Sequence, residues 1–382
     1  MACLITLWQE RIHYGPKPTA FGTASTDTVT YLICRKWINT SEIIRYHGYP
    51  SEEYQVTTED GYILGVFRIP AGRNNQNTGQ KPAVFLQHAF LGDATHWISN
   101  LPNNSLGFLL ADAGYDVWMG NSRGNTWSLK HKTLNPSQKA FWKFSFDEMG
   151  KYDIPAELYF IMNKTGQKDV YYVGHSEGTT TGFIAFSTYP ELAKRIKMFG
   201  ALSPVITGSY ATSPLVKIIS VPEPLLRVRY FSFLETQYLT YLQRYVAQVL
   251  HSFILSQHWI TAFITLLLSL QSRIDTYVGH SPAGTSVQDI IHWHQHSLRS
   301  PSFLQSTPPT YTIEKIGTPI AVWSGGQDKF ADPKDMANLL SRIPNLIYHE
   351  HFPAWGHLDF IWGLDATEKM YRKIIELMTK YF

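Results

Sequence analysis

The sequence has few cysteines, few charged residues and no uninterrupted hydrophobic run long enough to span a membrane. Its only two cysteines, Cys3 and Cys34, allow at most one disulfide, which excludes a disulfide-stapled scaffold. Charged residues make up 16% of the 382 positions, the formal net charge is +3, and the basic residues are scattered. This pattern argues against nucleic-acid binding and favours a small neutral or apolar partner.

Two apolar segments invite a targeting or membrane interpretation. Residues 2–8 are apolar, but Gln-Glu-Arg at 9–11 interrupts them before the length of a signal peptide, and no basic region precedes them. We therefore predict no signal peptide. Residues 253–270 contain several Ser, Thr, Gln and His side chains, which predicts an amphipathic or buried helix and no transmembrane span. Three N-x-Ser/Thr sequons permit a secretory route and begin at Asn39, Asn103 and Asn163.

Hydrophobic residues make up 44% of the chain, enough for a large buried core. Residues 54–68 predict a β-hairpin, because two β-rich runs flank Asp60-Gly61, which supplies the positive φ angles of a tight turn. Short apolar runs then alternate with helical stretches, which predicts an α/β fold with a mostly parallel sheet and helices on both faces. The predicted strands are 83–87, 116–119, 170–173, 198–202, 320–323 and 346–348.

The alternation of strands and helices is interrupted between residues 204 and 309, where Leu, Tyr, Phe and Gln are frequent. We interpret 204–309 as a mainly helical cap or lid, inserted into an α/β core formed by 39–203 and 310–382, after an N-terminal extension over 1–38.

Two helices are predicted in more detail. One places Ile154, Leu158 and Ile161 on a single stripe and ends near Gly166. The last helix begins with Asp365 as its cap and Glu368 in capping-box position. Its buried face is predicted to carry Met370, Ile374, Leu377 and Met378.

A candidate nucleophile lies in Gly174-His175-Ser176-Glu177-Gly178, between the strand ending at Val173 and a helix that starts near Thr179. This strand-turn-helix setting is that of the nucleophile elbow. A serine on such a sharp turn needs glycines beside it, because side chains there would collide with neighbouring backbone. The N-terminus of the next helix directs free N–H groups at a developing oxyanion. We therefore predict Ser176 as the nucleophile.

A second serine has a similar context in Gly279-His280-Ser281-Pro282-Ala283. The residue after a nucleophilic serine must donate its backbone N–H to the oxyanion, and Pro282 has no N–H. Ser281 is therefore predicted to be structural.

The order serine, acid, histidine directs the search for a carboxylate to residues beyond the cap. The strand 320–323 runs into a loop that ends at Asp328, at the edge where a nucleophile elbow would lie. Asp332 is the rival, but it precedes Pro333 and a helical pattern, which is typical of a helix N-cap. We predict Asp328 as the acid.

Three histidines compete for the base. His349 and His351 belong to the apolar run 346–352 and are predicted to be structural strand residues. His357 lies in a loop between the last strand and the last helix, from which its imidazole can reach Ser176. It would take the serine proton and return it to the leaving alcohol, while Asp328 fixes its tautomer.

The oxyanion hole is predicted from the loop His88-Ala89-Phe90-Leu91-Gly92, which follows the strand 83–87. The backbone N–H of Phe90 would pair with that of Glu177, and an ordinary strand-to-loop turn is the alternative. A second cluster, His292, His294 and His296, has no carboxylate or cysteine partner nearby, so we predict a solvated polar face and no metal site.

The chain closely resembles the acid lipase family, which includes gastric lipase and lysosomal acid lipase, from about residue 39 to 382. The resemblance rests on Tyr-His-Gly-Tyr-Pro-Ser-Glu-Glu-Tyr at 46–54, Ala-Asp-Ala-Gly-Tyr-Asp-Val-Trp-Met-Gly-Asn-Ser-Arg-Gly-Asn-Thr-Trp at 111–127, Ser-Pro-Ala-Gly-Thr-Ser-Val-Gln at 281–288 and His-Leu-Asp-Phe-Ile-Trp-Gly-Leu-Asp-Ala at 357–366. It implies the α/β-hydrolase fold with a cap and lid. The family's triad falls on Ser176, Asp328 and His357, and its oxyanion donors fall on Phe90 and Glu177.

The resemblance also implies a function: hydrolysis of triacylglycerols or cholesteryl esters at acidic pH and at a lipid–water interface, without cofactor or metal. A secreted or lysosomal location follows from the same family. Two other interpretations stay open. The triad also serves peptidases, esterases and thioesterases, and a catalytically silent lipid-binding relative would retain the same fold.

The sequence departs from the family at several points. The family's signal peptide is not evident, and Glu177 and Ala89 stand where the family usually has Gln and Gly. The predicted cap lacks the family's cysteines, and residues 293–308 look about half the usual length. A carboxylate at 177 would oppose the oxyanion unless it is protonated or turned away. We therefore hypothesise that Glu177 shifts the pH optimum further to the acid side.

Overall fold

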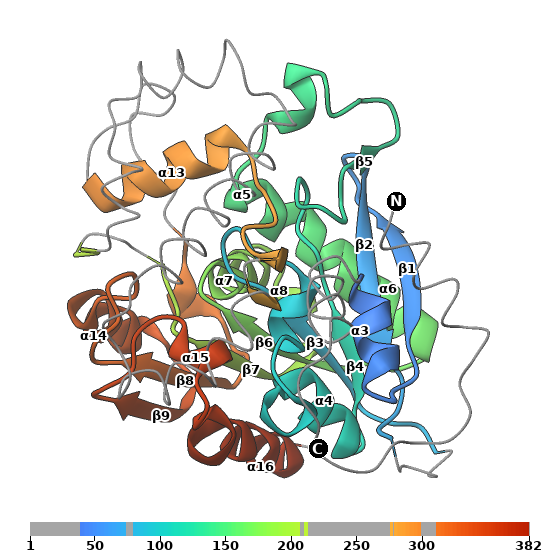
Figure 1. Cartoon of the computed structure of the whole chain (residues 1–382). Helices are drawn as coiled ribbons and strands as arrows, with labels where there is room; N and C mark the ends of the chain where they lie inside the picture. Colours follow the sequence, from blue (N-terminus) through green and yellow to red (C-terminus); the bar gives the residue numbers. More distant parts are fainter. Residues whose placement is uncertain are drawn as a thin grey trace, which may run out of the picture.

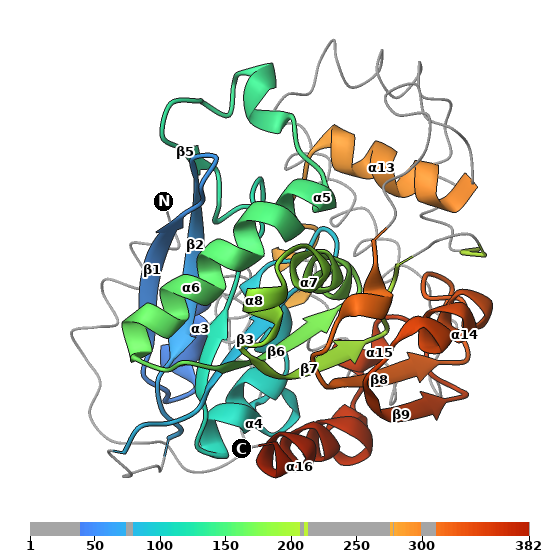
Figure 2. The same cartoon turned by 180° about the vertical axis from the view of Figure 1, so that it is seen from behind.

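A computed structural model describes residues 39–73, 79–206, 210–212, 276–277, 279–298 and 311–381. These residues form a nine-stranded sheet with helices on both faces (Figures 1 and 2). The strand order is β1-β2-β4-β3-β6-β7-β8-β9, and β5 pairs with β2. The strands are β1 Glu52–Thr57, β2 Tyr62–Ile69, β3 Ala83–Gln87, β4 Asp116–Met119, β5 Lys130–His131, β6 Val170–His175, β7 Ile196–Leu202, β8 Ile320–Gly325 and β9 Leu346–Phe352.

Helices connect and cover these strands. The α-helices are α3 Thr40–Tyr46, α4 Leu106–Asp112, α5 Phe146–Glu148, α6 Ile154–Thr165, α7 Glu177–Thr188, α8 Pro190–Ala193, α13 Val287–Leu298, α14 Pro333–Arg342, α15 Asp359–Trp362 and α16 Arg372–Lys380. Short 3-10 turns span Ala94–Trp97, Pro102–Asn104, Lys139–Trp142 and Ile313–Lys315, and π-helical turns span Met149–Asp153 and Thr367–Tyr371.

The predicted sheet is confirmed. β1 and β2 form the predicted antiparallel hairpin, while β4, β3, β6, β7, β8 and β9 run parallel in that order. Because parallel strands end at the same edge, the loops that follow β3, β6, β7, β8 and β9 gather there. This edge is where ligands bind in open α/β sheets.

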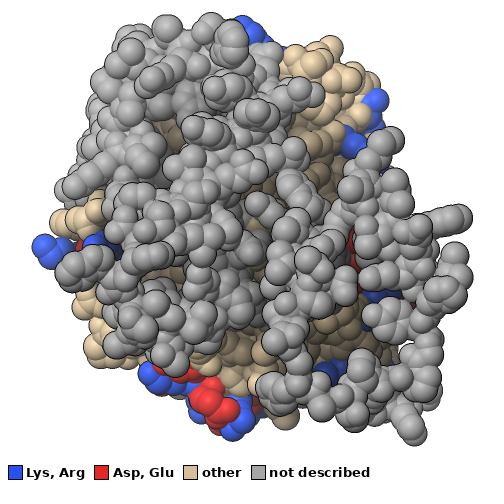
Figure 3. Space-filling model, viewed as in Figure 1, with Lys and Arg blue, Asp and Glu red and all other residues tan. Residues whose placement is uncertain are grey.

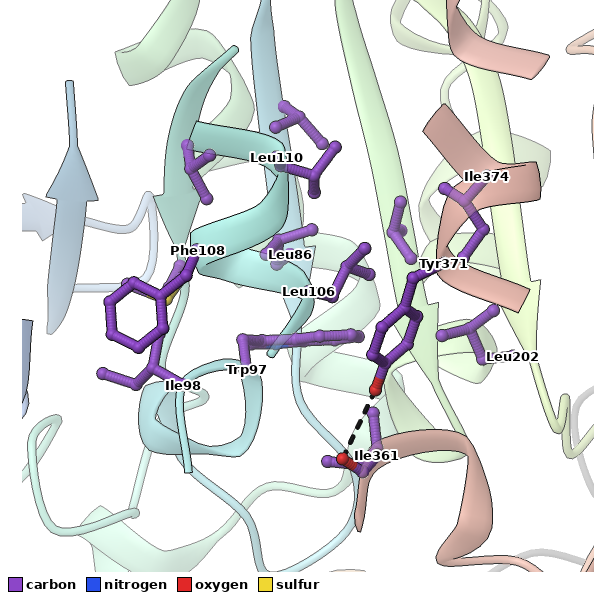
Figure 4. Packing of buried hydrophobic residues seen from close by; sticks show 14 of the residues in the cluster. Leu86, Trp97, Ile98, Leu106, Phe108, Leu110, Leu202, Ile361, Tyr371 and Ile374 are labelled. Atoms are coloured by element: carbon purple, nitrogen blue, oxygen red, sulfur yellow. Dashed lines mark hydrogen bonds between the residues drawn. The ribbon is translucent and has the colours of Figure 1, made fainter. Parts of the chain in front are cut away.

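Alternate residues of the buried strands supply two separate cores. Val84 and Leu86 face a core shared with α3, α4 and α16, whereas Ala83 and Phe85 face one shared with α6, α7 and α14. This period of two is the geometry of a strand buried on both faces. Figure 4 shows part of the first core, where the Tyr371 hydroxyl donates to the backbone oxygen of Ile361 at 3.3 Å.

Two helix starts differ from the prediction. α7 begins at Glu177, two residues before the predicted start near Thr179, because the elbow leads directly into it. The capping box at Asp365 and Glu368 is wrong: the last helix is capped at Ala366 without a side-chain bond. The two carboxylates instead form ion pairs one turn on, each at 2.7 Å, with Lys369 and Arg372.

The predictions for α6 and for the buried face of the last helix are confirmed. α6 buries Ile154, Leu158 and Ile161 and ends at Gly166, which adopts a left-handed φ of 69°. The final helix buries its predicted face.

At the lower edge of the face in Figure 3, acidic and basic side chains lie side by side, so the visible charge there is mixed in sign.

Most of the predicted cap, including residues 253–270, lies outside the described residues, as do the extension over 1–38 and both cysteines. The division into a core and a 204–309 cap therefore stays a prediction. Of that segment, α13 is described and lies over the edge where the parallel strands end (Figure 1). Within the described ranges, no helix combines the length and apolar character that crossing a membrane requires.

Candidate active site

Ser176 lies on a sharp turn between β6 and α7. Its φ of 54° and ψ of −117° are rarely adopted by residues other than glycine. A Cβ at Gly174 would lie 2.5 Å from the backbone oxygen of Gly178, and a Cβ at Gly178 would lie 2.3 Å from that of Gln87. The two glycines of the motif are therefore required by close backbone approach, as predicted.

The structure brings the three predicted triad residues into one hydrogen-bonded line. The Nε2 atom of His357 lies 2.7 Å from the Oγ of Ser176. On the other side of the ring, Nδ1 lies 2.9 Å from Oδ2 and 3.0 Å from Oδ1 of Asp328. His357 comes from the loop after β9 and Asp328 from the loop after β8, so both reach the serine from the same sheet edge.

The electrostatics of this line favour proton transfer from the serine. Burial would raise the pKa of Asp328, but the charge of His357 and hydrogen bonds from His357 and other donors lower it to about 2. Two of those donors are the backbone N–H groups of Phe330 and Ala331, each 2.9 Å from Oδ1. An ionised Asp328 holds the proton of His357 on Nδ1, which leaves Nε2 free to accept the proton of Ser176.

The rejected acid and base candidates have structural roles. Asp332 caps α14, and its side chain accepts from the N–H of Lys334 at 2.8 Å, as predicted. His349 and His351 lie in β9 and both contact the Ser324 hydroxyl, at 2.9 and 3.0 Å.

Helix α13, in the predicted cap segment, packs against α5 and the residue before it. His292 stacks on Phe146 with ring centroids 4.0 Å apart, and its Nδ1 lies 2.9 Å from the Ser145 Oγ. The predicted solvated face is therefore wrong for His292, because α13 packs this residue against α5. Among the described residues, no group of His, Cys, Asp or Glu is arranged to hold a metal ion. Ser281 donates its backbone N–H to the Tyr277 oxygen at 2.8 Å.

The loop after β3 is held as a tight turn beside the elbow. The N–H of Gly92 donates to the Ala89 oxygen at 2.9 Å, and the ring of His88 bonds that same oxygen through Nδ1 at 2.8 Å. The start of α7 packs on this loop, since a Cβ at Gly178 would lie 2.7 Å from the His88 oxygen. The segments that carry the N–H groups of Phe90 and Glu177 are thus neighbours, and their oxyanion role stays a prediction.

Comparisons with known proteins give the family of this chain. Residues 82–364 match the model of the alpha/beta hydrolase fold, and residues 40–101 match a partial alpha/beta-hydrolase lipase region. The chain is 52% identical to human lysosomal acid lipase/cholesteryl ester hydrolase over 369 residues, covering 90% of this chain and 91% of that protein. The chain belongs to the acid lipase family of α/β-hydrolases. Human gastric triacylglycerol lipase is 49% identical over the same shares of both chains.

Solved structures support the fold of this acid lipase relative. A thermophilic esterase from Thermogutta terrifontis matches with a TM-score of 0.54 and 16% identity, over 86% of this chain and 99% of that one. An esterase from Exiguobacterium antarcticum matches with a TM-score of 0.53 and 14% identity, over 86% and 100%.

Sequence reasoning missed three residues around the predicted triad of this family member. Ser203, just after β7, donates its hydroxyl to Asp328 and lies 2.8 Å from Nδ1 of His357. His175 donates from Nε2 to the backbone oxygen of His357 at 2.9 Å and accepts at Nδ1 from His96, also at 2.9 Å. Burial, together with the charge of His357, lowers the pKa of His175 to about 3, so it remains a neutral support.

The side chain of Glu177 does not present a bare charge in this member of the family. It is buried, and its Oε1 accepts from the indole N–H of Trp293 in α13 at 2.6 Å. Burial and the neighbouring Asp289 raise the pKa of Glu177 well above its usual value. Burial also raises the pKa of Asp289, to about 7. Glu177 is therefore protonated at acidic pH. Protonation is one of the two conditions under which a carboxyl at this position does not oppose the oxyanion.

Proposed function

We propose that this protein is a lipase that hydrolyses acyl esters of neutral lipids, such as triacylglycerols or cholesteryl esters. The hydrogen-bonded line from Ser176 through His357 to Asp328 is the observation that carries the proposal. The names of the relatives, a cholesteryl ester hydrolase and a triacylglycerol lipase, support the substrate class. The same relatives support a lysosomal or secreted location.

The reaction proceeds in two acyl transfers. The Oγ of Ser176 attacks the ester carbonyl carbon while Nε2 of His357 takes the serine proton. The N–H groups of Phe90 and Glu177 stabilise the resulting oxyanion. His357 then protonates the departing alcohol, which leaves an acyl group on Ser176. Water, deprotonated by His357, cleaves this acyl-enzyme and releases the fatty acid, so no metal or cofactor is required.

Three exposed leucines, of which one directly follows His357 in the chain, support action at a lipid–water interface. Leu358 is 48% exposed, and Leu364 and Leu101 are 58% and 53% exposed. The loops that carry Leu101 and Leu364 are tied together, because the Asn104 side chain donates to the Gly363 oxygen at 3.0 Å. Exposed leucines on these loops suit contact with an acyl-rich surface.

Turnover of a short-chain nitrophenyl ester by wild type and Ser176→Ala tests the proposal. We expect the variant to lose at least about 10⁴-fold in kcat/KM, the scale of triad removal in other serine hydrolases. Ser281→Ala is the matched control and should retain activity. Wild-type turnover that does not depend on Ser176 would instead indicate a lipid-binding relative. A chain-length series on glycerides and cholesteryl esters then ranks the substrates.

A further inference from the structure

We propose that Ser203 is a positioning residue that shares the Asp328 carboxylate with His357 and thereby keeps the imidazole in its basic form at lower pH. The catalytic part of this inference rests on the proposed function. Ser203 belongs to neither the elbow nor the oxyanion loop: it follows β7, which lies between the strands that carry Ser176 and Asp328.

The backbone aims this hydroxyl at the acid–base pair. Ser203 is fully buried, and its N–H donates to the Trp323 oxygen at 2.8 Å. Its φ of 45° lies in the left-handed region, which glycine adopts with less strain than serine. Strained residues persist where the surrounding structure fixes them and tend to cluster at active sites. In this conformation the hydroxyl donates to Oδ2 of Asp328 and lies 2.8 Å from Nδ1 of His357.

The Nδ1–H of His357 therefore has three oxygen atoms within 3.0 Å, two from Asp328 and one from Ser203. A carboxylate is a stronger acceptor for a charged N–H than a neutral hydroxyl. Ser203 weakens the carboxylate contact in two ways, because it occupies one lone pair of Asp328 and also competes for the imidazole proton. Less support for the imidazolium means that His357 stays unprotonated, and able to act as a base, at lower pH.

The other neighbours of His357 add no charge that would change its protonation, so we assign this effect to Ser203. In the described part of the chain, the titratable groups that face the ring besides Asp328 are His175 from β6 and, behind it, His96 from the 3-10 turn Ala94–Trp97. Burial lowers the pKa of both histidines, so neither adds a charge at working pH. The ring of Phe330 packs 4.8 Å from the imidazole and is uncharged.

The test compares Ser203→Ala and Ser203→Gly with wild type over a pH series of kcat/KM on a soluble short-chain ester. Both variants lack the hydroxyl, and glycine also relieves the left-handed φ. We expect the acid limb of both profiles to move up by about half a pH unit or more, a roughly threefold or larger loss of activity below the limb, with KM nearly unchanged. Ser203→Thr, which restores a hydroxyl, should return the limb toward wild type.

Ser324→Ala is the matched control, because it removes a buried serine hydroxyl near the end of the adjacent strand β8. Among the described residues, this hydroxyl has hydrogen bonds with His349 and His351 and with no other side chain. Its acid limb should stay in place. NMR titration of the His357 ring in the same variants measures the shift without turnover, so failure of the proposed function is distinguishable from failure of this inference. An unmoved His357 titration in both Ser203→Ala and Ser203→Gly would overturn the inference.

Discussion

The side chains around Ser176 divide into groups that react and groups that hold them. The Asp328 carboxylate holds His357 by accepting the proton on Nδ1 of the ring. The backbone N–H groups of Phe330 and Ala331 in turn hold this carboxylate. Replacing it with Asn would offer an amide of the same shape that can direct an N–H at Nδ1. The ring would then carry its proton on Nε2, where it could no longer accept from Ser176.

We therefore expect Asp328→Asn to reduce kcat about 10⁴-fold, the loss known for this change of tautomer in a serine protease triad. Steady-state kinetics on a nitrophenyl ester measures it. Asp332→Asn is the matched control, because Asp332 only caps α14 and Asn caps nearly as well. If Asp328→Asn keeps kcat within tenfold of wild type, Asp328 is not the residue that orients the base.

The triad could be predicted from sequence because each member has a local signature: glycines around the serine, a strand before the acid, and a loop before the last helix for the base. Ser203 has no such signature, since a lone serine after a strand is ordinary until the fold places it beside Asp328. The pair of His175 and His96 was also unpredictable, because the two rings meet only through contacts between elements 79 residues apart.

Two elements meet at the proposed oxyanion hole. Helix α13 directs Asp289 and Trp293, one turn apart, at the side chain of Glu177, the first residue of α7. Asp289 is held in turn by the N–H of Phe146 at 2.8 Å and the hydroxyl of Thr285 at 2.8 Å. The protonation of this carboxyl pair thus links α13 to the elbow.

Glu177→Gln tests the effect of that link on pH dependence. Below the raised pKa of Glu177 both enzymes are neutral at position 177, so their rates should agree. Above it, wild type gains a negative charge beside the oxyanion and loses rate, whereas Gln stays neutral. Gln can still accept from Trp293 and donate to Asp289. We expect the alkaline limb of the kcat profile to extend to higher pH in the variant.

The exposed Glu191 in α8 provides the control, since Glu191→Gln removes a carboxyl far from the elbow and should leave the profile unchanged. Superimposable profiles for wild type and Glu177→Gln would contradict the hypothesis that this residue favours acidic operation.

At the level of elements, apolar runs and turn residues were enough to predict the strands, because their alternation reports burial directly. The helix starts were harder. Asp365 and Glu368 have the spacing of a capping box, but nearby Lys369 and Arg372 offer each carboxylate a charged partner, and these pairs form instead. An acidic side chain at such a position can cap the helix or form an ion pair. Packing decides between the two, and the sequence pattern does not contain that packing.

Across the whole molecule, the buried titratable groups set how stability depends on pH. Buried histidines with lowered pKa, such as His175 and His96, stay neutral while the unfolded chain takes up protons below about pH 6.5. They favour unfolding as the pH falls. Buried carboxyls with raised pKa act in the opposite sense, because the folded protein keeps protons that the unfolded chain releases as the pH rises. The buried histidines therefore limit the pH range of stability on the acid side, and the buried carboxyls limit it on the alkaline side.

Glu157 in α6 isolates the carboxyl part of this balance. It is fully buried, and burial followed by the charge of Asp153 raises its pKa well above 4.5. Its Oε1 accepts from the N–H of Asn121 at 3.4 Å, and its Oε2 has no partner among the described residues. The Oε1 of Gln87 is also buried and has no partner among the described residues. Both this atom and the Oε1 of Glu157 lie next to the position that a Cβ at Gly120 would take. A glutamine amide at 157 therefore has an acceptor nearby.

Glu157→Gln should therefore flatten the pH dependence of stability. Below pH 4.5 the carboxyl is protonated in both folded and unfolded chains, so variant and wild type should differ little. Above it, only the unfolded wild type releases the proton, which lowers its unfolding free energy by up to about 1.4 kcal/mol for each pH unit, and glutamine removes that loss. Denaturant unfolding between pH 4 and 7.5 measures the difference, with Glu368→Gln on the exposed face of the last helix as control. Parallel curves for wild type and Glu157→Gln would mean that Glu157 ionises in the folded protein as readily as in the unfolded chain.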